Sequence, residues 1–176
     1  MSDFFLDQAR LGNMYSACSA GAVTLSTVST TCTGLSLSNP TGSNVDLVVY
    51  QVDFVPSTAP AGVSVVGIAI HTAISTTDTT NTTPMVVHNA RAAGNVSGGR
   101  PKGRADASST LIATPLWLRP MSGVTGATSL SPTKYSDETR GSIIIPPGGA
   151  LSLSYLTTAA LRIASVTWVE ITAANV

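Results

Sequence analysis

Apolar and polar residues alternate along much of the chain, and this alternation predicts β-strands. The clearest example lies over residues 44–54, where Val48, Tyr50, Val52 and Phe54 are separated by single residues. Side chains on a strand point to opposite faces with a period of two, so we expect these four on one buried face. Further strands are expected over residues 23–25, 35–37, 63–70, 85–88, 111–118, 142–145, 150–156 and 161–172.

The strands are separated by turn signals and by longer polar stretches. Residues 39–44 and 146–149 are rich in Pro, Gly and Asn, which is typical of tight turns. Residues 89–109 and 120–139 lack an apolar period, and they are expected to form two long loops. Residues 72–83 are rich in Thr and are expected to form a loop or an edge strand. Pro115 within 111–118 predicts an edge position or a bulge, because proline cannot donate to a sheet.

These features together predict an all-β fold. No predicted helix is long enough to connect parallel strands, so the strands are expected to pair antiparallel in a β-sandwich, specifically a jelly roll. The length of 176 residues suits one such domain. We assign residues 14–176 to this domain and residues 1–13 to a short N-terminal arm.

The N-terminal arm carries the one expected helix, over residues 3–11. Phe4, Phe5, Leu6 and Leu11 are apolar, and Ser2 or Asp3 could cap the helix. A short apolar arm before a β domain either packs on its own core or docks on a neighbouring subunit. The N-terminus has no basic start followed by an apolar run, so a secretory signal is not expected.

Composition narrows the classes of partner. Charged residues make up 10% of the chain and hydrophobic residues 43%, and the formal net charge is zero. No long-range field would attract nucleic acid or an anionic membrane, so neither partner is expected. No stretch approaches 18 consecutive apolar residues, as a membrane-spanning helix would require. Few charges and no net charge also favour self-association.

The residues that carry chemistry are sparse and scattered. His71 and His88 lack the spacing of metal ligands, and no Gly-x-Ser-x-Gly motif is present. We therefore expect no enzyme activity, no metal and no cofactor. Cys18 and Cys32 are expected to be buried free thiols, although they could also face each other across a hairpin and form a bridge.

One stretch concentrates positive charge. Arg91, Arg100, Lys102 and Arg104 lie in a Gly-rich segment. This segment is either a solvated loop or a flexible arm that becomes ordered on an acidic partner surface. No aromatic residue is interleaved with the basic ones, so the stacking platform typical of single-stranded nucleic-acid binding is missing.

Two segments resemble a known class of protein. Residues 35–45, followed by a long strand, look like the opening hairpin of small bacteriophage virion proteins. Residues 143–153 combine an apolar strand, a Pro-Gly turn and an alternating strand, and they resemble the end of jelly-roll capsid decoration (cement) proteins and fibre-head domains.

The resemblance implies a virion structural protein on the capsid exterior, assembled in the host cytoplasm. Such decoration proteins commonly form homotrimers that bind the major capsid protein and their sister subunits. The resemblance further implies that the N-terminal arm and the basic segment make these contacts. The residues expected to do so are Phe4, Phe5, Leu6, Arg91, Arg100, Lys102 and Arg104.

Two other functions remain open from the sequence. The first is a receptor- or carbohydrate-binding head of a tail fibre, or a lectin-like module; Tyr15 and Tyr135 are the aromatic residues best placed for stacking on a sugar. The second is an enzyme such as a glycoside hydrolase, whose paired carboxylates can come from distant parts of a chain.

Overall fold

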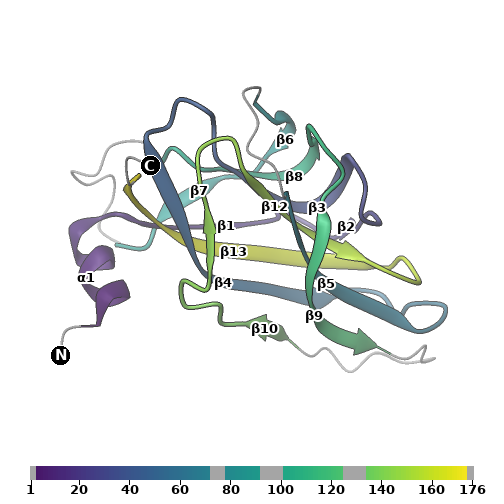
Figure 1. The fold of residues 1–176 in the computed structure, drawn as a ribbon. Coiled ribbons are helices and arrows are strands. Elements are labelled where there is room, and N and C mark those ends of the chain that lie inside the picture. The colour runs from purple at the N-terminus through teal and green to yellow at the C-terminus, as the bar shows by residue number, and fades with distance from the viewer. Residues whose placement is uncertain (1–2, 72–77, 92–100, 125–133, 174–176) are drawn as a thin grey trace.

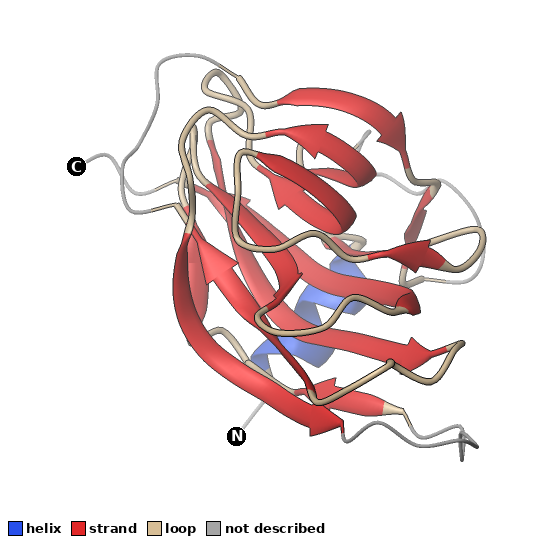
Figure 2. Cartoon of the chain, turned by 90° about the vertical axis from the view of Figure 1, so that its right-hand side faces the viewer, coloured by secondary structure: helices blue, strands red, loops and turns tan. Residues whose placement is uncertain are grey.

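A computed structural model describes residues 3–71, 78–91, 101–124 and 134–173. Over these residues the chain forms one short helix and two antiparallel sheets that pack face to face (Figure 1). The predicted all-β sandwich is confirmed. Figure 2 views the molecule end-on, with the strands of both sheets in front and the helix behind them.

Sheet A is seven-stranded, and its central strands are the longest in the chain. Its main path runs β10-β4-β13-β1-β7, while β11 pairs with β4 and β2 pairs with β13. The bounds are β1 Met14–Cys18, β2 Val23–Thr24, β4 Val45–Pro56, β7 Val87–Asn89, β10 Tyr135–Asp137, β11 Ile143–Ile145 and β13 Leu161–Thr172.

Sheet B is six-stranded, with the order β6-β8-β3-β12-β5-β9. Its two edges are therefore β6 and β9. The bounds are β3 Thr31–Ser38, β5 Ser64–Ile70, β6 Thr80–Pro84, β8 Arg104–Thr110, β9 Leu116–Val124 and β12 Ala150–Tyr155.

The core fills the space between the inner faces of the two sheets. Alternate residues supply it, such as Leu35 and Leu37 of β3 and Leu151 and Leu153 of β12, all of which are fully buried. Trp168 of β13 is the largest of the fully buried side chains. Burial of these side chains is the main stabilising contribution, at about 1.5–3 kcal/mol for each large one.

Strand β4 departs from the predicted alternation. Its pairing with β13 shifts register between Thr167 and Trp168, and Tyr50 is the extra residue on β4. Such a bulge turns the residues before it to the opposite face. Val52 and Phe54 face the core as predicted, whereas Val48 and Tyr50 lie on the outer face of sheet A. The prediction that all four share one face was therefore wrong.

The bulge creates an apolar outer patch that the helix covers. Helix α1, Phe4–Leu11, begins where the Asp3 side chain accepts a hydrogen bond from the Phe5 N–H (3.1 Å). It ends at Gly12, whose φ of 82° is a left-handed conformation that glycine adopts without strain. Phe5 and Ala9 pack on the patch formed by the buried Met14, Val48 and Val169.

The predicted loops are shorter than expected. The segment 89–109 ends in strand β8, which pairs with both β3 and β6. The segment 120–139 contains the end of β9 and all of β10. Strand β8 contains small polar residues such as the half-buried Ser108 and the buried Ser109, and it forms without an apolar run because it pairs with a strand on each side. Strand β9 begins at Leu116, five residues after the predicted start at Leu111, and it is an edge strand as Pro115 suggested.

Candidate functional site

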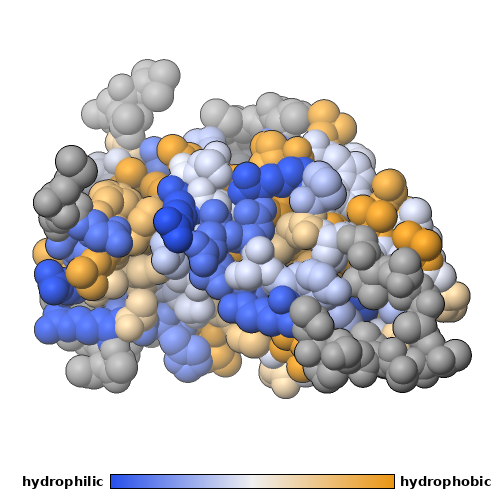
Figure 3. All heavy atoms as spheres, turned by 90° about the horizontal axis from the view of Figure 1, so that it is seen from below, coloured by the Kyte–Doolittle hydropathy of each residue, from blue (hydrophilic) through white to orange (hydrophobic). Residues whose placement is uncertain are grey.

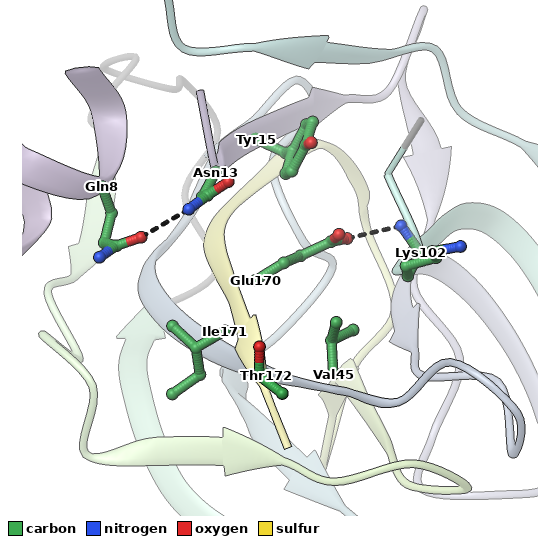
Figure 4. A pocket seen from close by; sticks show the side chains of 8 residues that line it. All are labelled: Gln8, Asn13, Tyr15, Val45, Lys102, Glu170, Ile171 and Thr172. Carbon is green, nitrogen blue, oxygen red and sulfur yellow. Dashed lines mark hydrogen bonds between the residues drawn. The ribbon is translucent and has the colours of Figure 1, made fainter. Parts of the chain in front are cut away.

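Helix α1 and the basic segment meet at one end of the sandwich. Gln8 of α1 and Lys102 of the basic segment line the same hollow, together with residues from β1, β4 and β13 (Figure 4). The hollow has a volume of about 380 Å³, and its walls are Gln8, Asn13, Tyr15, Val45, Lys102, Glu170, Ile171 and Thr172. Two elements predicted to contact partners are thus brought together, although they are far apart in the sequence.

The helix presents an apolar flank beside this hollow. Phe4, Gln8 and Leu11 recur at helical spacing and share one flank, while Phe5 turns toward sheet A. Phe4 is 44% exposed and Leu11 is 59% exposed. Leu6 is also exposed, at 49%, on another side of the helix. Of the predicted contact residues in the arm, Phe4 and Leu6 are available to a partner, whereas Phe5 is partly buried against Tyr50.

The basic residues are distributed along this end of the molecule. Arg91 donates from Nη1 to the Arg10 carbonyl oxygen (3.3 Å), which ties it to the C-terminus of the helix. Lys102 is exposed and lines the hollow. Arg104 lies 3.7 Å from the Asp78 carboxylate in an exposed ion pair. Arg100 lies outside the described residues.

A second hollow adjoins the first at Lys102. It too has a volume of about 380 Å³, and it is lined by Pro40, Gly42, Ser43, Asp78, Pro101, Lys102 and Arg104. Lys102 therefore stands between two concave surfaces, with the Asp78–Arg104 pair on the far side. Hydrogen bonding from the Thr41 backbone N–H (2.8 Å) holds the pKa of Asp78 below its usual value, with a smaller contribution from Arg104.

The Glu170 carboxylate fixes the position of the basic segment. Its Oε1 accepts hydrogen bonds from the backbone N–H of Lys102 (2.7 Å) and of Gly103 (2.8 Å), and from Trp168 Nε1 (3.2 Å). Burial raises the pKa of Glu170, and these donors offset part of that rise. Glu170 thus anchors the segment from the C-terminal end of β13.

Tyr15 forms the floor of the hollow. It is buried, and its ring centroid lies 6.0 Å from that of Trp168. Burial raises its pKa, and the nearby Glu170 charge adds to the rise. Tyr135, the other aromatic residue expected to face a sugar, stacks on Phe54 at 5.0 Å. The prediction that Tyr15 is well placed to stack on a sugar was therefore wrong.

The polar groups at this end converge on the first hollow. The hollow offers a lysine ammonium, a carboxylate and the amide groups of Gln8 and Asn13, which hydrogen-bond each other (2.8 Å). Such groups form ion pairs and hydrogen bonds with a polar partner, and the flank of Phe4 and Leu11 adds apolar area. Within the described ranges, no group of three or more His, Cys, Asp or Glu residues could hold a metal ion.

The two cysteines are both free. Cys32 is buried as expected, and burial raises the pKa of its thiol to about 11. Cys18 is exposed, contrary to the prediction, because it lies at the end of β1 with its side chain outside the core. Burial also lowers the pKa of His71, which stays neutral more readily than an exposed histidine.

Sequence reasoning missed Glu170, Gln8 and Asn13. Glu170 interrupts the apolar run at the end of the last strand. This charged residue among apolar ones was the one available signal of a site at that position. Gln8 and Asn13 belong to no recognisable motif. They line the hollow only because helix α1 docks on sheet A, and the sequence does not show where the helix docks.

The helix in the described part of the chain is too short and too polar to cross a bilayer. Comparison with protein-family models, with curated proteins and with solved structures finds no match to this sequence.

Proposed function

We propose that this protein is a structural component of a bacteriophage virion, a decoration protein that binds the outside of the head through protein–protein contacts. Its partners would be the major capsid protein and sister subunits in a homotrimer. The proposal rests chiefly on one observation: an exposed apolar helix flank and the basic segment converge on the same end of the sandwich.

The strand pairing supports a jelly roll, the architecture of many capsid proteins. Without the short β2 and the β6–β8 segment, the chain pairs like one long folded hairpin: β1 with β13, β3 with β12, β4 with β10 and β11, and β5 with β9. The remaining contacts, β4 with β13 and β5 with β12, roll this hairpin into two sheets. We propose the jelly-roll topology on this basis.

The β6–β8 segment is then an insertion between the two central strands of the hairpin. It adds β7 to sheet A beside β1, and β8 and β6 to sheet B beside β3. Lys102 and Arg104 lie within this insertion. A sandwich that carries an added basic segment at one end suits a protein whose role is to hold neighbours together.

Binding to capsids tests the proposal. Empty expanded heads, purified from a phage whose genome encodes this chain, are mixed with the protein and sedimented. We expect saturable co-sedimentation, weakened at least fivefold by Phe4→Asp and by Lys102→Gln. Lys134→Gln is the matched control, because Lys134 is an exposed lysine that pairs with Asp53 away from this end (3.0 Å). A monomeric protein that does not co-sediment would contradict the proposal.

A second candidate function is recognition of a glycan by the same hollow. The observation that favours it is the convergence of Gln8, Asn13, Lys102 and Glu170 on a space of about 380 Å³. Carboxylate and amide groups hydrogen-bond sugar hydroxyls well. Saturable binding of one oligosaccharide class on a glycan array, abolished by Gln8→Ala, would favour this function over decoration.

A further inference from the structure

A positive charge is buried at the end of the sandwich that lies away from helix α1 (Figure 1). Arg162 is the second residue of β13, and it is 1% exposed. Its Cζ lies 5.9 Å from the centre of the Phe54 ring in sheet A, and its Nη2 donates to the Ser64 hydroxyl at the start of β5 in sheet B (3.3 Å). The guanidinium therefore lies between the two sheets, close to one end of the core.

No acidic side chain of the protein balances this charge. All nine acidic residues lie within the described ranges, and none of the ion pairs found there includes Arg162. Burial lowers the pKa of Arg162, as expected for a cation that is removed from water without a carboxylate beside it. Arginine still keeps its proton at neutral pH. Buried charges in proteins are normally paired, so Arg162 is an exception that needs an explanation.

The guanidinium also has an incompletely used hydrogen-bonding edge. Nη1 donates to the Leu161 carbonyl oxygen (3.0 Å) and Nη2 to the Ser64 hydroxyl (3.3 Å), whereas Nε has no partner among the described residues. Nε and Nη2 lie on the same side of the guanidinium and can donate two parallel hydrogen bonds to one carboxylate. An anion that binds this edge would have to displace only the long contact with Ser64.

The surroundings of Arg162 are otherwise apolar. The Phe54 ring belongs to the core and stacks on Tyr135 (5.0 Å). On the surface at this end, Val63 is 54% exposed and Leu156 is 58% exposed. Figure 3 shows hydrophobic residues gathered at the right-hand end of the face seen from below, which is the end away from helix α1, while hydrophilic residues cross its middle. A ligand that suits this end combines a negative charge with an apolar body.

We propose that Arg162 binds the carboxylate of a short aliphatic monocarboxylic acid. One guanidinium balances the single charge of a carboxylate. A phosphate monoester carries roughly 1.5–2 negative charges and three strong acceptor oxygens, and it would need more donors than Arg162 and Ser64 supply. Because Arg162 is buried, the ligand enters when the loops at residues 57–63 and 156–160 move apart, and loops open at a lower free energy than core strands. This site goes beyond the proposed function, since it lies at the other end of the sandwich from the candidate capsid contact.

Thermal unfolding at constant ionic strength tests this proposal. Butyrate replaces chloride stepwise, and the neutral butyramide is the matched control compound. We expect the Tm of the wild-type protein to rise with butyrate and to saturate, by roughly 5 °C at about 100 times the Kd, because a ligand that binds only the folded state stabilises it. Butyramide and inorganic phosphate should give no saturable rise. A saturable rise with phosphate but not with butyrate would overturn the assignment of a carboxylate.

Variants of Arg162 show whether the response belongs to this residue. Arg162→Met removes the charge and keeps an extended side chain, and buried charges can be replaced by apolar residues with little loss of stability. We expect it to lose the response to butyrate, whereas Arg140→Gln, at an exposed arginine paired with Glu138, should respond like the wild type. Arg162→Lys keeps the charge without the two-donor edge and should raise the Kd for butyrate about tenfold or more, as measured by isothermal titration calorimetry.

Three results would overturn the proposal: no response of the wild type, an equal response in Arg162→Met, or an unchanged Kd in Arg162→Lys. The calorimetric comparison of Arg162→Lys with the wild type decides the matter if Arg162→Met does not fold. Co-sedimentation of Arg162→Lys with heads should equal that of the wild type. Failure of this site would therefore leave the proposed function standing, and failure of capsid binding would leave this site standing.

Discussion

Two carboxylates, one partly buried and one fully buried, differ in their hydrogen bonding. Glu170, at the end of β13, accepts three hydrogen bonds on one oxygen. Asp106 of β8 is fully buried on sheet B, and neither of its oxygens accepts a hydrogen bond. Burial raises the pKa of Asp106 to about 6, and the nearby Thr83 N–H and Arg104 charge offset this only in part.

The difference shows what each carboxylate does for the fold. A partly buried carboxylate that accepts hydrogen bonds positions the groups that donate to it, whereas a buried one without hydrogen bonds costs free energy whenever it is ionised. Glu170 therefore stabilises the basic segment next to the candidate site. Asp106, on β8 beside the edge strand β6, destabilises sheet B at neutral pH.

The largest effect is expected from Glu170→Ala. This change leaves the N–H groups of Lys102 and Gly103 and the indole N–H of Trp168 without their acceptor. We expect the free energy of unfolding to fall by about 2–4 kcal/mol, since bonds to a charged group contribute about 1.5–3 kcal/mol each and do not add fully. Urea unfolding followed by Trp fluorescence measures it.

Glu138→Ala is the matched control for Glu170→Ala. Glu138 is exposed and pairs with Arg140, two residues away. Exposed ion pairs contribute about 0–1 kcal/mol, so the control should be close to the wild type. Equal losses in the two variants would mean that Glu170 does not anchor the segment.

Asp106→Asn should change how stability depends on pH. Because the pKa of Asp106 is raised in the folded state, its favourable contribution is present below about pH 4 and is lost as the pH rises through about 6. At pH 8 the ionised side chain costs about 1–3 kcal/mol. We expect the wild-type protein to lose that amount between pH 4 and pH 8 relative to Asp106→Asn.

Comparing the wild-type protein with Asp106→Asn at each pH separates the contribution of Asp106 to stability from that of His71. Burial lowers the pKa of His71, so its contribution has the opposite sign and is lost as the pH falls through about 6.5. His71 is present in both proteins and cancels in the difference. Parallel pH profiles for the two proteins would show that Asp106 is not the source of the dependence.

The core strands could be predicted from the sequence, whereas strand β8, which carries Asp106, could not. The strands of the core followed from apolar alternation, as in Leu151 and Leu153, because burial of one face dictates that pattern. Strand β8 was missed because Ala105, Asp106 and Ser109 show no apolar period. Its position between β3 and β6 comes from pairing with distant residues, which a local pattern does not contain.

The candidate site was predictable only in part. Phe4, Lys102 and Arg104 were found from their residue types, since exposed apolar and basic residues outside the strands are unusual in so uncharged a chain. That helix α1 and Lys102 border the same hollow depends on the bulge at Tyr50, which creates the apolar patch where α1 docks. Bulges carry no reliable signal in a single sequence.

Gly103→Ala should have an intermediate effect and should act at the same place as Glu170. A Cβ atom at Gly103 would lie 2.9 Å from Trp168 Nε1 and 3.0 Å from Leu47 Cδ1, both within the core. We expect a loss of about 1–2 kcal/mol from overpacking. Gly42→Ala is the control, since nothing lies within 4 Å of its Cβ position. A loss in Gly42→Ala as large as that in Gly103→Ala would contradict the close-packing argument.

The smallest effect, and the most local, is expected in the reactivity of Cys32. Its thiol packs with Leu111 and Ala150, and its pKa of about 11 leaves little thiolate at pH 8. Labelling with a thiol reagent should modify Cys18 quickly, and Cys32 only when this part of sheet B opens.

Asp106→Asn should slow the labelling of Cys32 by about tenfold for each 1.4 kcal/mol of stabilisation gained. Glu170→Ala removes the anchor at Lys102 and Gly103 just before β8, whereas Cys32 pairs with Ser109 near the other end of that strand. This variant should leave that rate unchanged if the opening is local. A rate that follows global stability in both variants would show instead that the two carboxylates belong to one cooperative unit.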